Sequence, residues 1–457
     1  MGATSGPDLL RSPLFPTLIR LSLPNMAVML ATALVAVAET AYVGRLGTTA
    51  LAGLALAFPM VMLQQMMSAG AMGGGVSSAV SRALGAGDTA RAGSLALHAA
   101  LIGLAAGLVF TGFFLILGRD VYALLGGRGA ALEEAVAYSN IVFLGAAGVW
   151  LTNTFASVVR GTGNMAVPSA TLLVVAGLQI VLGGGFGLGL GPLPRLGMPG
   201  VALGQAVAFA AGAGFLLWFL ASGRSRVRLR VAGAALSRDL FRDILRVGAV
   251  ACISPLQTVL TVLILTALVA RFGTEALAGY GIGARLEFLL VPICFAIGVA
   301  CVPMVGMAIG AGDVVRARRV AWLGGGLSAA ILGTVGLVVA LAPDLWARLF
   351  TAEPAVLEAA RAYFRWAGPA YGFFGLGLCL YFASLGAGKV LGPVLAGTLR
   401  LAVVAVGGWW ITADEAPLPA LFAVVAAAMV VYGGATALAV ACVPWGPRRA
   451  ATAPVTP

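Results

Sequence analysis

Long and nearly uncharged apolar stretches recur along the whole chain and predict its architecture. Each has about 20 or more residues, which is enough for an α-helix to cross roughly 30 Å of hydrocarbon. A membrane β-barrel would instead alternate polar and apolar residues, and these stretches do not. We therefore predict an all-α polytopic membrane protein with twelve transmembrane helices. The predicted spans are residues 17–44, 53–79, 94–117, 135–159, 168–190, 200–221, 247–270, 276–303, 320–342, 362–384, 390–412 and 418–443.

Composition and charge agree with a membrane protein. Of the 457 residues, 61% are hydrophobic and 10% are charged, and the mean hydropathy is +1.03. The net charge of +12 comes mainly from arginines in the loops after even-numbered spans, such as Arg82, Arg91 and Arg160. By the positive-inside rule, both termini are then cytoplasmic. The basic excess reflects this topology and attraction to anionic lipid head groups, so we expect membrane lipids and no nucleic acid as partners. High Ala, Gly and Arg content, with Lys389 as the only lysine, indicates a bacterial inner membrane protein.

The chain contains an internal duplication. RLGTTALAG (45–53) returns as RFGTEALAG (271–279), an offset of 226, and GAGDTARA (85–92) returns as GAGDVVRA (310–317), an offset of 225. Each copy holds six spans, so both enter the membrane from the same side as parallel repeats about an axis along the membrane normal. The predicted units are a six-helix lobe over 1–221, an arginine-rich cytoplasmic linker over 222–246 and a second six-helix lobe over 247–457. Asp88 and Asp313, which follow the repeated glycines, should cap the helices after them.

Duplicated halves that face each other across a cavity are typical of secondary transporters, which open that cavity alternately to each side. A membrane enzyme acting on lipids would need a cluster of His, Asp or Ser side chains, and the sequence offers one histidine and two acids deep in spans. We therefore predict a transporter rather than an enzyme, with no cofactor and no metal site.

His98 is interpreted as a packed or interface histidine, with a proton relay as the alternative. The five cysteines lie in apolar spans without metal-ligand spacing and are interpreted as small hydrophobic residues.

Glu39 is the first candidate for chemistry, because a carboxylate inside a transmembrane helix costs about 2.5 kcal/mol or more. Its repeat counterpart is Leu265, so the shared architecture does not require a charge there. Asn25, Thr32 and Glu39 are spaced by seven residues, which places them on one face of the first span and predicts that this face lines a cavity. A carboxyl group removed from water favours its neutral form, which suits reversible protonation. The alternative is a structural hydrogen-bond partner near the membrane surface, close to Arg45.

Four segments together resemble the multidrug and toxic compound extrusion (MATE) family. They are PNMAVMLATALVAVAETAYVGRLGTTALAGLALAFP, GGGVSSAVSRALGAGDTARA, GTEALAGYGIGARLE and PMVGMAIGAGD, in this order along the chain. The resemblance implies a secondary antiporter that exports organic cations and other xenobiotics in exchange for protons or sodium. It implies that Glu39 stands where the family usually has an essential aspartate. Further polar positions of one branch fall on Gln179, Gly183 and Gln205, and the second carboxylate of that branch is missing.

A hard cation prefers several oxygen ligands. The missing carboxylate therefore favours a proton over sodium, although Gln179, Gln205 and Thr32 could supply neutral oxygens. The predicted cation-coupling group is Glu39, Thr32, Asn25, Gln179 and Gln205.

The predicted substrate cavity contains further polar residues within spans. Gln64, Gln65 and Asn153 are amides in hydrocarbon that need partners, either for function or for helix packing. Glu287 is the other deep acid; Arg285 lies two residues away and points to another side of the helix, whereas Arg400 could serve as its partner. The group has either a transport role or the role of a polar clamp between helices. The predicted cavity residues are Gln64, Asn153, Tyr42, Arg285, Glu287 and Arg400.

We expect a monomer that takes amphipathic or cationic small molecules. A flippase for lipid-linked precursors is the alternative within the same superfamily. It would line the cavity with several arginines, of which only Arg285 and Arg400 are available.

Overall fold

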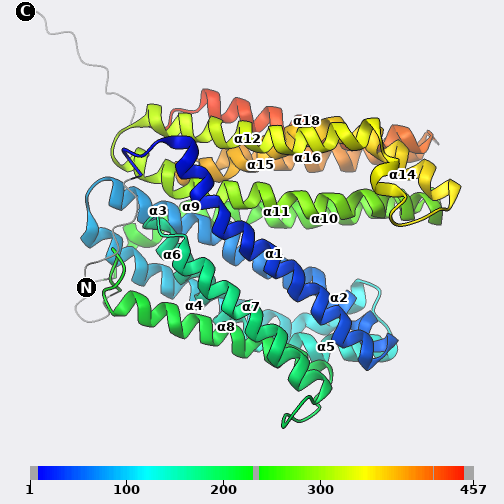
Figure 1. Cartoon of the computed structure of the whole chain (residues 1–457), viewed down its shortest axis with the longest axis horizontal. Helices are drawn as coiled ribbons and strands as arrows, with labels where there is room; N and C mark the ends of the chain where they lie inside the picture. The colour runs from blue at the N-terminus through cyan, green and yellow to red at the C-terminus, as the bar shows by residue number, and fades with distance from the viewer. Residues whose placement is uncertain (1–8, 230–235, 415, 447–457) are drawn as a thin grey trace, which may run out of the picture.

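The protein folds into two lobes of membrane-length helices, seen in a computed structural model that describes residues 9–229, 236–414 and 416–446 (Figure 1). The first lobe contains α1 (Leu14–Leu46), α2 (Thr48–Gln65), the π-helix η1 (Met66–Met72), α3 (Gly73–Gly85), α4 (Thr89–Leu124), α5 (Gly129–Leu144), α6 (Ala146–Gly161), α7 (Ala166–Leu188) and α8 (Met198–Ala221). The second lobe contains α9 (Arg238–Ala251), α10 (Ile253–Ala270), α11 (Thr274–Gly310), α12 (Val314–Leu341), α13 (Asp344–Ala347), α14 (Pro354–Ala367), the 3-10 helix η2 (Gly368–Ala370), α15 (Tyr371–Gly386), α16 (Leu391–Ala402), the π-helix η3 (Val403–Gly407), α17 (Gly408–Ala413) and α18 (Leu418–Cys442).

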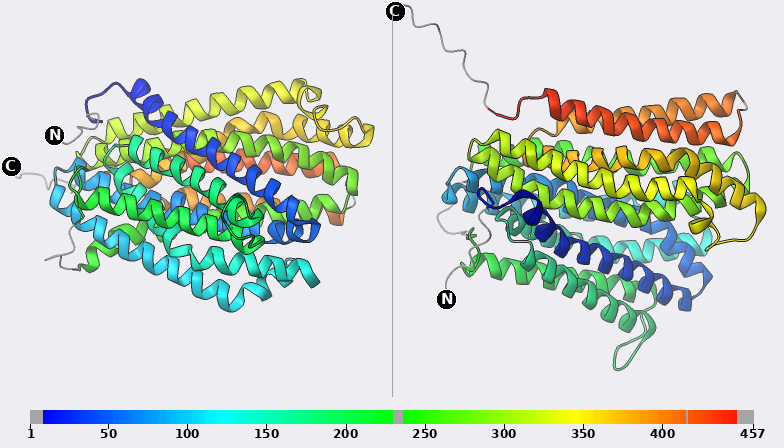
Figure 2. Two further views of the ribbon diagram at one scale, coloured as in Figure 1. Left: turned by 60° about the horizontal axis from the view of Figure 1, so that its bottom comes forward. Right: turned by 45° about the horizontal axis from the view of Figure 1, so that its top comes forward.

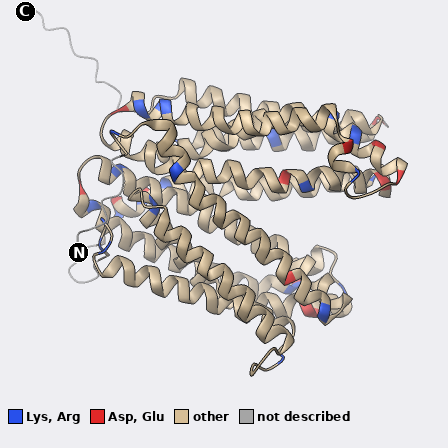
Figure 3. Cartoon of the chain, in the orientation of Figure 1, with Lys and Arg blue, Asp and Glu red and all other residues tan. Residues whose placement is uncertain are grey.

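The predicted all-α membrane architecture is confirmed. Among the described residues, eleven helices are long and apolar enough to cross a membrane, and a twelfth span results if the bent pair of α5 and α6 counts as one. That pair bends by 47° and covers the predicted span 135–159. Figure 3 shows charged residues gathered mainly at the two ends of the bundle, with few between them.

The two lobes meet at one end of the bundle and diverge toward the other. Helices α3, α6 and α9 lie together at the end where α1 begins and α18 ends (Figure 1). Toward α2, α5 and α14 the ribbons of the two lobes separate in the view of Figure 1, whereas in the turned views of Figure 2 they overlap. In this view the bundle has the outline of a V, and the cluster shared by α3, α6, α9 and α11 lies at its narrow end.

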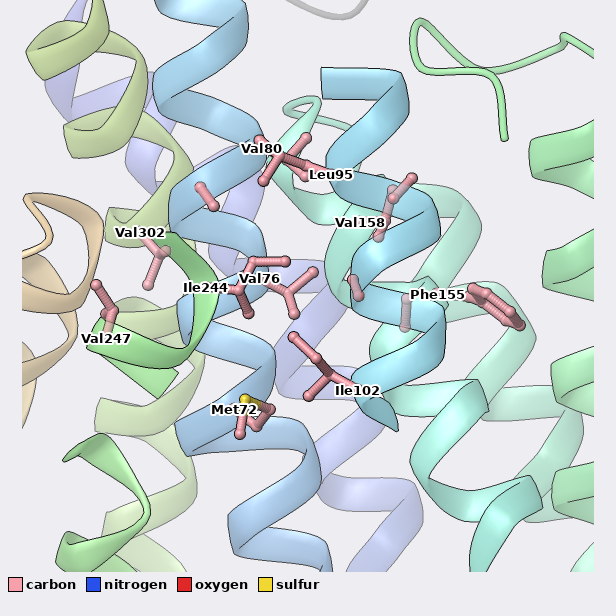
Figure 4. Packing of buried hydrophobic residues seen from close by; sticks show 14 of the residues in the cluster. Met72, Val76, Val80, Leu95, Ile102, Phe155, Val158, Ile244, Val247 and Val302 are labelled. Atoms are coloured by element: carbon pink, nitrogen blue, oxygen red, sulfur yellow. The ribbon is translucent and has the colours of Figure 1, made fainter. Parts of the chain in front are cut away.

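A shared hydrophobic core joins the lobes at the narrow end. Met72, Val76 and Val80 of η1 and α3 pack in one cluster with residues of α4 and α6 from the first lobe and of α9 and α11 from the second (Figure 4). Small residues allow this close approach: a Cβ on Gly310 would collide with the Arg82 carbonyl oxygen, and one on Gly85 would collide with the Met307 carbonyl oxygen. Gly85 and Gly310 are repeat equivalents, as are Arg82 and Met307. The contact is therefore nearly symmetric about the axis that relates the lobes.

Equivalent contacts inside each lobe show the duplication in three dimensions. A Cβ on Gly161 would lie 3.0 Å from the Ser77 carbonyl oxygen, and one on Gly386 would lie 2.6 Å from the Val302 carbonyl oxygen. These pairs obey the offset of 225. Near the other end of the lobes, Gly53 packs on Glu134 and Ala135 as Gly279 packs on Ala359 and Ala360.

The change of offset from 226 to 225 has a structural cause. Between Gly53 and Ser77 the first copy has one residue more than the second copy has between Gly279 and Val302. The π-helix η1 (Met66–Met72) lies in this interval, whereas α11 is α-helical throughout. A π-turn holds one extra residue without breaking the helix. η1 thus keeps the packing on both sides of it in register.

The stretch between the lobes is partly helical. Residues 222–229 are irregular, α9 begins at Arg238, and 230–235 lie outside the described residues. Buried His98 accepts a hydrogen bond from the Ser237 backbone N–H to Nε2 at 3.0 Å, and its Nδ1 lies 2.7 Å from the Ser94 carbonyl oxygen. Its ring also packs on Phe241. These contacts fit the interface role of His98, and the predicted limits of the linker stay a prediction.

Both predicted helix caps are present. The Asp88 carboxylate accepts a hydrogen bond from the Arg91 backbone N–H at 2.8 Å, and Asp313 accepts the equivalent bond from Arg316 at 2.9 Å. Each satisfies an amide that the first turn of a helix leaves without a partner. The repeated GAGD loops are therefore helix-to-helix connections, as the sequence predicts.

Candidate functional site

Glu39 of α1 is buried against α7 and has one hydrogen-bond partner among the described residues. Its side chain is 9% exposed, and Gln179 Nε2 donates to its Oε1 at 2.8 Å. No cationic side chain lies within 4.0 Å of the carboxylate in the described part of the chain; in particular, Arg45 makes no ion pair with it. A carboxylate that is removed from water and lacks a counter-charge is a group that gains from binding a cation.

Glycines of α7 create the space around this carboxylate. A Cβ on Gly184 would lie 3.1 Å from the Tyr42 ring, so Tyr42 lies flat against α7 one turn after Glu39. On another face of α7, a Cβ on Gly204 of α8 would collide with the backbone of Gly183. The run Gly183–Gly185 therefore lets α7 contact both α1 and α8 closely, which holds Gln179 at the height of Glu39.

The other predicted coupling residues do not contact Glu39. Asn25 of α1 is buried against the first turn of α7, where its Oδ1 accepts a hydrogen bond from Ser169 Oγ at 3.5 Å. Thr32 is exposed and donates to the Val28 carbonyl of its own helix. Because Asn25 and Glu39 are 14 residues apart, they are separated by about 21 Å along α1.

Gln205 is 3% exposed, and no hydrogen bond joins it to Glu39. Of the predicted group, the structure brings only Gln179 to the carboxylate, since a seven-residue spacing gives a shared face but not a shared site.

The amides of the first lobe tie helices together. Asn153 Nδ2 of α6 donates to Gln65 Oε1 at 3.1 Å and to Ser68 Oγ at 2.8 Å. These contacts hold α2 and η1 against α6. Gln64 is 1% exposed, and neither side-chain polar atom has a hydrogen-bond partner among the described residues. The contacts of Asn153 therefore fit the packing alternative, while Gln64 has no partner for its side-chain polar atoms among the described residues.

Glu287 in the second lobe receives its hydrogen bond from an aromatic residue. The Tyr363 hydroxyl of α14 donates to Glu287 Oε1. The Tyr363 ring meets those of Tyr280 and Phe422 at centroid distances of 5.6 and 5.2 Å. The role of Arg400 as a partner of Glu287 stays a prediction: the Arg400 charge acts on that carboxyl group, but no ion pair joins the two side chains among the described residues. The reason is helix placement: α16 packs against α10 and α18, with Arg400 Cζ 5.2 Å from the Phe374 ring centroid.

Arg285 points away from Glu287, as the two-residue spacing predicts. Its guanidinium carbon lies 5.1 Å from the centroid of the Phe350 ring, in the segment that follows α13. Arg285 and Arg400 thus lie over different aromatic rings.

Comparison with known proteins agrees with this geometry. The family model MatE matches residues 24–183 and 251–410, one match in each lobe. The chain belongs to the MatE family.

Curated relatives of this MatE protein are transporters. A probable multidrug resistance protein NorM of Thermotoga maritima is 26% identical over 382 residues, which cover 83% of this chain and 81% of the relative. An FAD transporter of Shewanella oneidensis is 28% identical over 389 residues, which cover 82% of each chain. The multidrug export protein MepA of Staphylococcus aureus is 26% identical over 290 residues, which cover 62% of this chain and 63% of the relative.

Solved MATE structures share the fold. A MOP superfamily transporter from Pyrococcus furiosus matches with a TM-score of 0.86 and 23% identity, over 96% of this chain and 97% of its own. A multidrug resistance MATE family transporter in an outward-facing conformation matches with a TM-score of 0.83 and 24% identity, over 96% of each chain. Two duplicated lobes of membrane-length helices, with eleven or twelve spans among the described residues, are the architecture of this MatE protein.

The structure also places one candidate residue near Glu39 that the sequence analysis missed. Tyr138 of α5 is buried within electrostatic range of Glu39, and its repeat equivalent is Tyr363, the partner of Glu287. The two acids are not equivalent, since Glu39 comes from α1 and Glu287 from α11. Only the repeat alignment, with tyrosines at 138 and 363, carried a signal for this arrangement.

Proposed function

We propose that this protein is a secondary antiporter that exports organic cations and other drugs in exchange for protons, with Glu39 as the coupling group. The observation that carries the proposal is the burial of Glu39 with one neutral hydrogen-bond donor and no counter-charge among the described residues. Such a carboxylate can bind either a proton or a cationic substrate. Because the two compete for one negative charge, the binding of one favours the release of the other.

Gln179 suits a carboxyl group that changes its protonation state. When Glu39 is ionised, the amide N–H of Gln179 donates to it, as in this structure. When Glu39 is protonated, its O–H can donate to the amide oxygen after the amide turns over, because a glutamine both donates and accepts. A lysine or arginine at position 179 would instead hold Glu39 permanently ionised. The neutral amide thus stabilises the site in both states.

Proton coupling is favoured over sodium coupling by the donor set. Sodium is a hard cation that binds best to several oxygens. The contact of Gln179 with Glu39 is made through its N–H, and Gln205 and Thr32 do not contact the carboxylate. One carboxylate is sufficient to carry a proton.

Alternating access gives the proton its direction. The narrow end carries Arg82 and Arg91, and the positive-inside rule places such loops in the cytoplasm. The separated ends of the lobes then face outward, where the inward proton gradient protonates Glu39 and releases the substrate. The electrical part of that gradient supplies about 2.3 kcal/mol per charge per 100 mV.

The second lobe offers surfaces for an amphipathic cation. Glu287, with the rings of Tyr280, Tyr363 and Phe422 around it, combines a carboxyl group with aromatic faces, and both attract organic cations. A flippase has less support, because Arg285 and Arg400 lie over separate rings rather than together where one phosphate would sit. The working unit in this proposal is a monomer in the bacterial inner membrane, with both termini cytoplasmic.

The test is dye efflux from proteoliposomes under an imposed pH gradient without sodium, with expression and insertion matched. We expect Glu39→Gln to abolish active efflux and Glu39→Asp to retain part of it. Gln keeps an oxygen that can accept the bond from Gln179, so the fold should persist. Glu133→Gln is the matched control, since that exposed acid of the same lobe pairs with Arg119 at the surface. Glu287→Gln should do less harm than Glu39→Gln. Wild-type efflux by Glu39→Gln would show that the carboxylate is structural, and efflux driven only by a sodium gradient would replace the proton by sodium.

A further inference from the structure

An arginine is buried without a counter-charge where the two lobes meet. Arg160, near the end of α6, is 6% exposed, and its Nε atom has no hydrogen-bond partner. No acidic side chain lies within 4.0 Å of it among the described residues. An uncompensated guanidinium in a low-dielectric interior is costly, and a neutral partner cannot cancel its charge. This position therefore favours an anion.

Arg160 lines a small cavity together with two serines. The cavity has a volume of about 10 Å³ and is also lined by Ser77 of α3 and Ser157 of α6. The Ser77 Oγ atom is buried and has no hydrogen-bond partner in the described part of the chain. Glycines complete the polar wall, and a Cβ on Gly73 would lie only 2.5 Å from Ser157 Oγ. Arg160 and two serines thus line a space with room for about one water molecule.

The wall from the second lobe is made of the repeat equivalents of the first wall, and it is apolar. At the offset of 225, Gly74, Ser77 and Ser157 correspond to Val299, Val302 and Phe382, and all six line the cavity. Arg160 corresponds to Leu385. The same backbone positions can therefore be filled by apolar side chains alone, so the fold does not require an arginine or two serines there. The first lobe has a polar version of a surface that the second lobe has in apolar form.

We propose that this cavity binds one small monovalent anion of halide size, such as chloride, between the lobes. Arg160 supplies the charge, Ser77 and Ser157 donate hydrogen bonds, and Val299, Val302 and Phe382 exclude water. A space of this size favours a small anion over larger carboxylate substrates and phosphate. Because both lobes line the cavity, bound anion stabilises the state in which the lobes are in contact at this end. Separation of the lobes opens the site and releases the anion.

The first test is thermal unfolding of the purified full chain in detergent. Sodium chloride, sodium bromide and sodium gluconate are compared at equal ionic strength. We expect the unfolding midpoint of the wild type to be about 2 °C or more higher in chloride and bromide than in gluconate, which is too large for the cavity. Arg160→Leu, which copies Leu385, should fold and lose this difference. Arg119→Gln, at an exposed arginine of the same lobe, should keep it.

Two further measurements test the proposal even if Arg160→Leu does not fold. Ser77→Val, which copies Val302, should reduce the halide effect while Arg160 stays in place. Wild-type crystals grown in bromide should show an anomalous peak beside the Arg160 guanidinium. Equal midpoints in chloride and gluconate, an undiminished halide effect in Arg160→Leu, or bromide density elsewhere only would overturn the proposal.

Discussion

The Nε2 atom of Gln179 lies 2.8 Å from the Oε1 atom of Glu39, and this bond joins α7 to α1 through the buried carboxyl group. We predict that Gln179→Leu lowers pH-driven dye efflux by about tenfold, since a hydrogen bond to a charged group contributes about 1.5–3 kcal/mol. Gln205→Leu is the matched comparison, because Gln205 is also buried but makes no bond to Glu39. Both variants are assayed in proteoliposomes at equal protein content. Equal losses in the two variants would mean that the Gln179 bond has no special part in coupling.

Asp243 of α9 connects the second lobe to two arginines of the first. It lies 2.7 Å from Arg82 and 3.1 Å from Arg91, and all three side chains are only partly exposed. We predict that Asp243→Asn favours separation of the lobes at the narrow end by about 1 kcal/mol. Spin labels on α3 and α11 should then report a larger fraction of long distances. Asp239→Asn, at an exposed acid of the same helix, is the control, and a matching shift in that variant would assign the effect to net charge alone.

Gly310 and Gly85 let α3 and α11 cross with their backbones in contact. We predict that Gly310→Ala and Gly85→Ala each weaken the contact between lobes by about 1–3 kcal/mol, because the added Cβ meets a carbonyl oxygen that cannot move aside. Hydrogen exchange should then become faster at the adjoining ends of α3 and α11. Gly326→Ala in α12 has open space at its Cβ and should leave exchange unchanged. Slow exchange in both interface variants would show that this end tolerates wider helix spacing.

Much of the fold could be predicted from the sequence because membrane helices are governed by length and hydropathy. Lipid requires every backbone polar group to be bonded within the segment, so a long apolar stretch has few other structures available. The repeat could be predicted equally well, since Asp88 and Asp313 cap the equivalent helix in each copy. The bend between α5 and α6 was less visible, because both halves of that span are apolar.

The candidate site was predictable only in part. Glu39 was evident from the cost of its charge in an apolar helix, and the family resemblance pointed to Gln179. The failures concern distance between helices. Thr32 shares a face with Glu39 but bonds its own backbone, and Arg400 lies over the Phe374 ring and forms no ion pair with Glu287 among the described residues. Arg160 was interpreted as one of many topology-setting arginines, since a sequence does not show that serines and glycines from other helices enclose it.

The π-helix η1 gives the first half of the chain one residue that the second half lacks, and a substitution cannot remove this difference in length. A chimera of two first halves would carry two copies of η1, and a chimera of two second halves would carry η3 twice but no copy of η1. Both would keep the glycine contacts of Gly53 or Gly279 and of Gly161 or Gly386, because these lie outside the turn. Ser68 and Gly70, however, lie within it, beside the Asn153 bonds and the Arg160 cavity. The extra residue of η1 thus lies beside polar side chains inside the first lobe, and a one-residue deletion there should disturb these contacts more than the outline of the bundle.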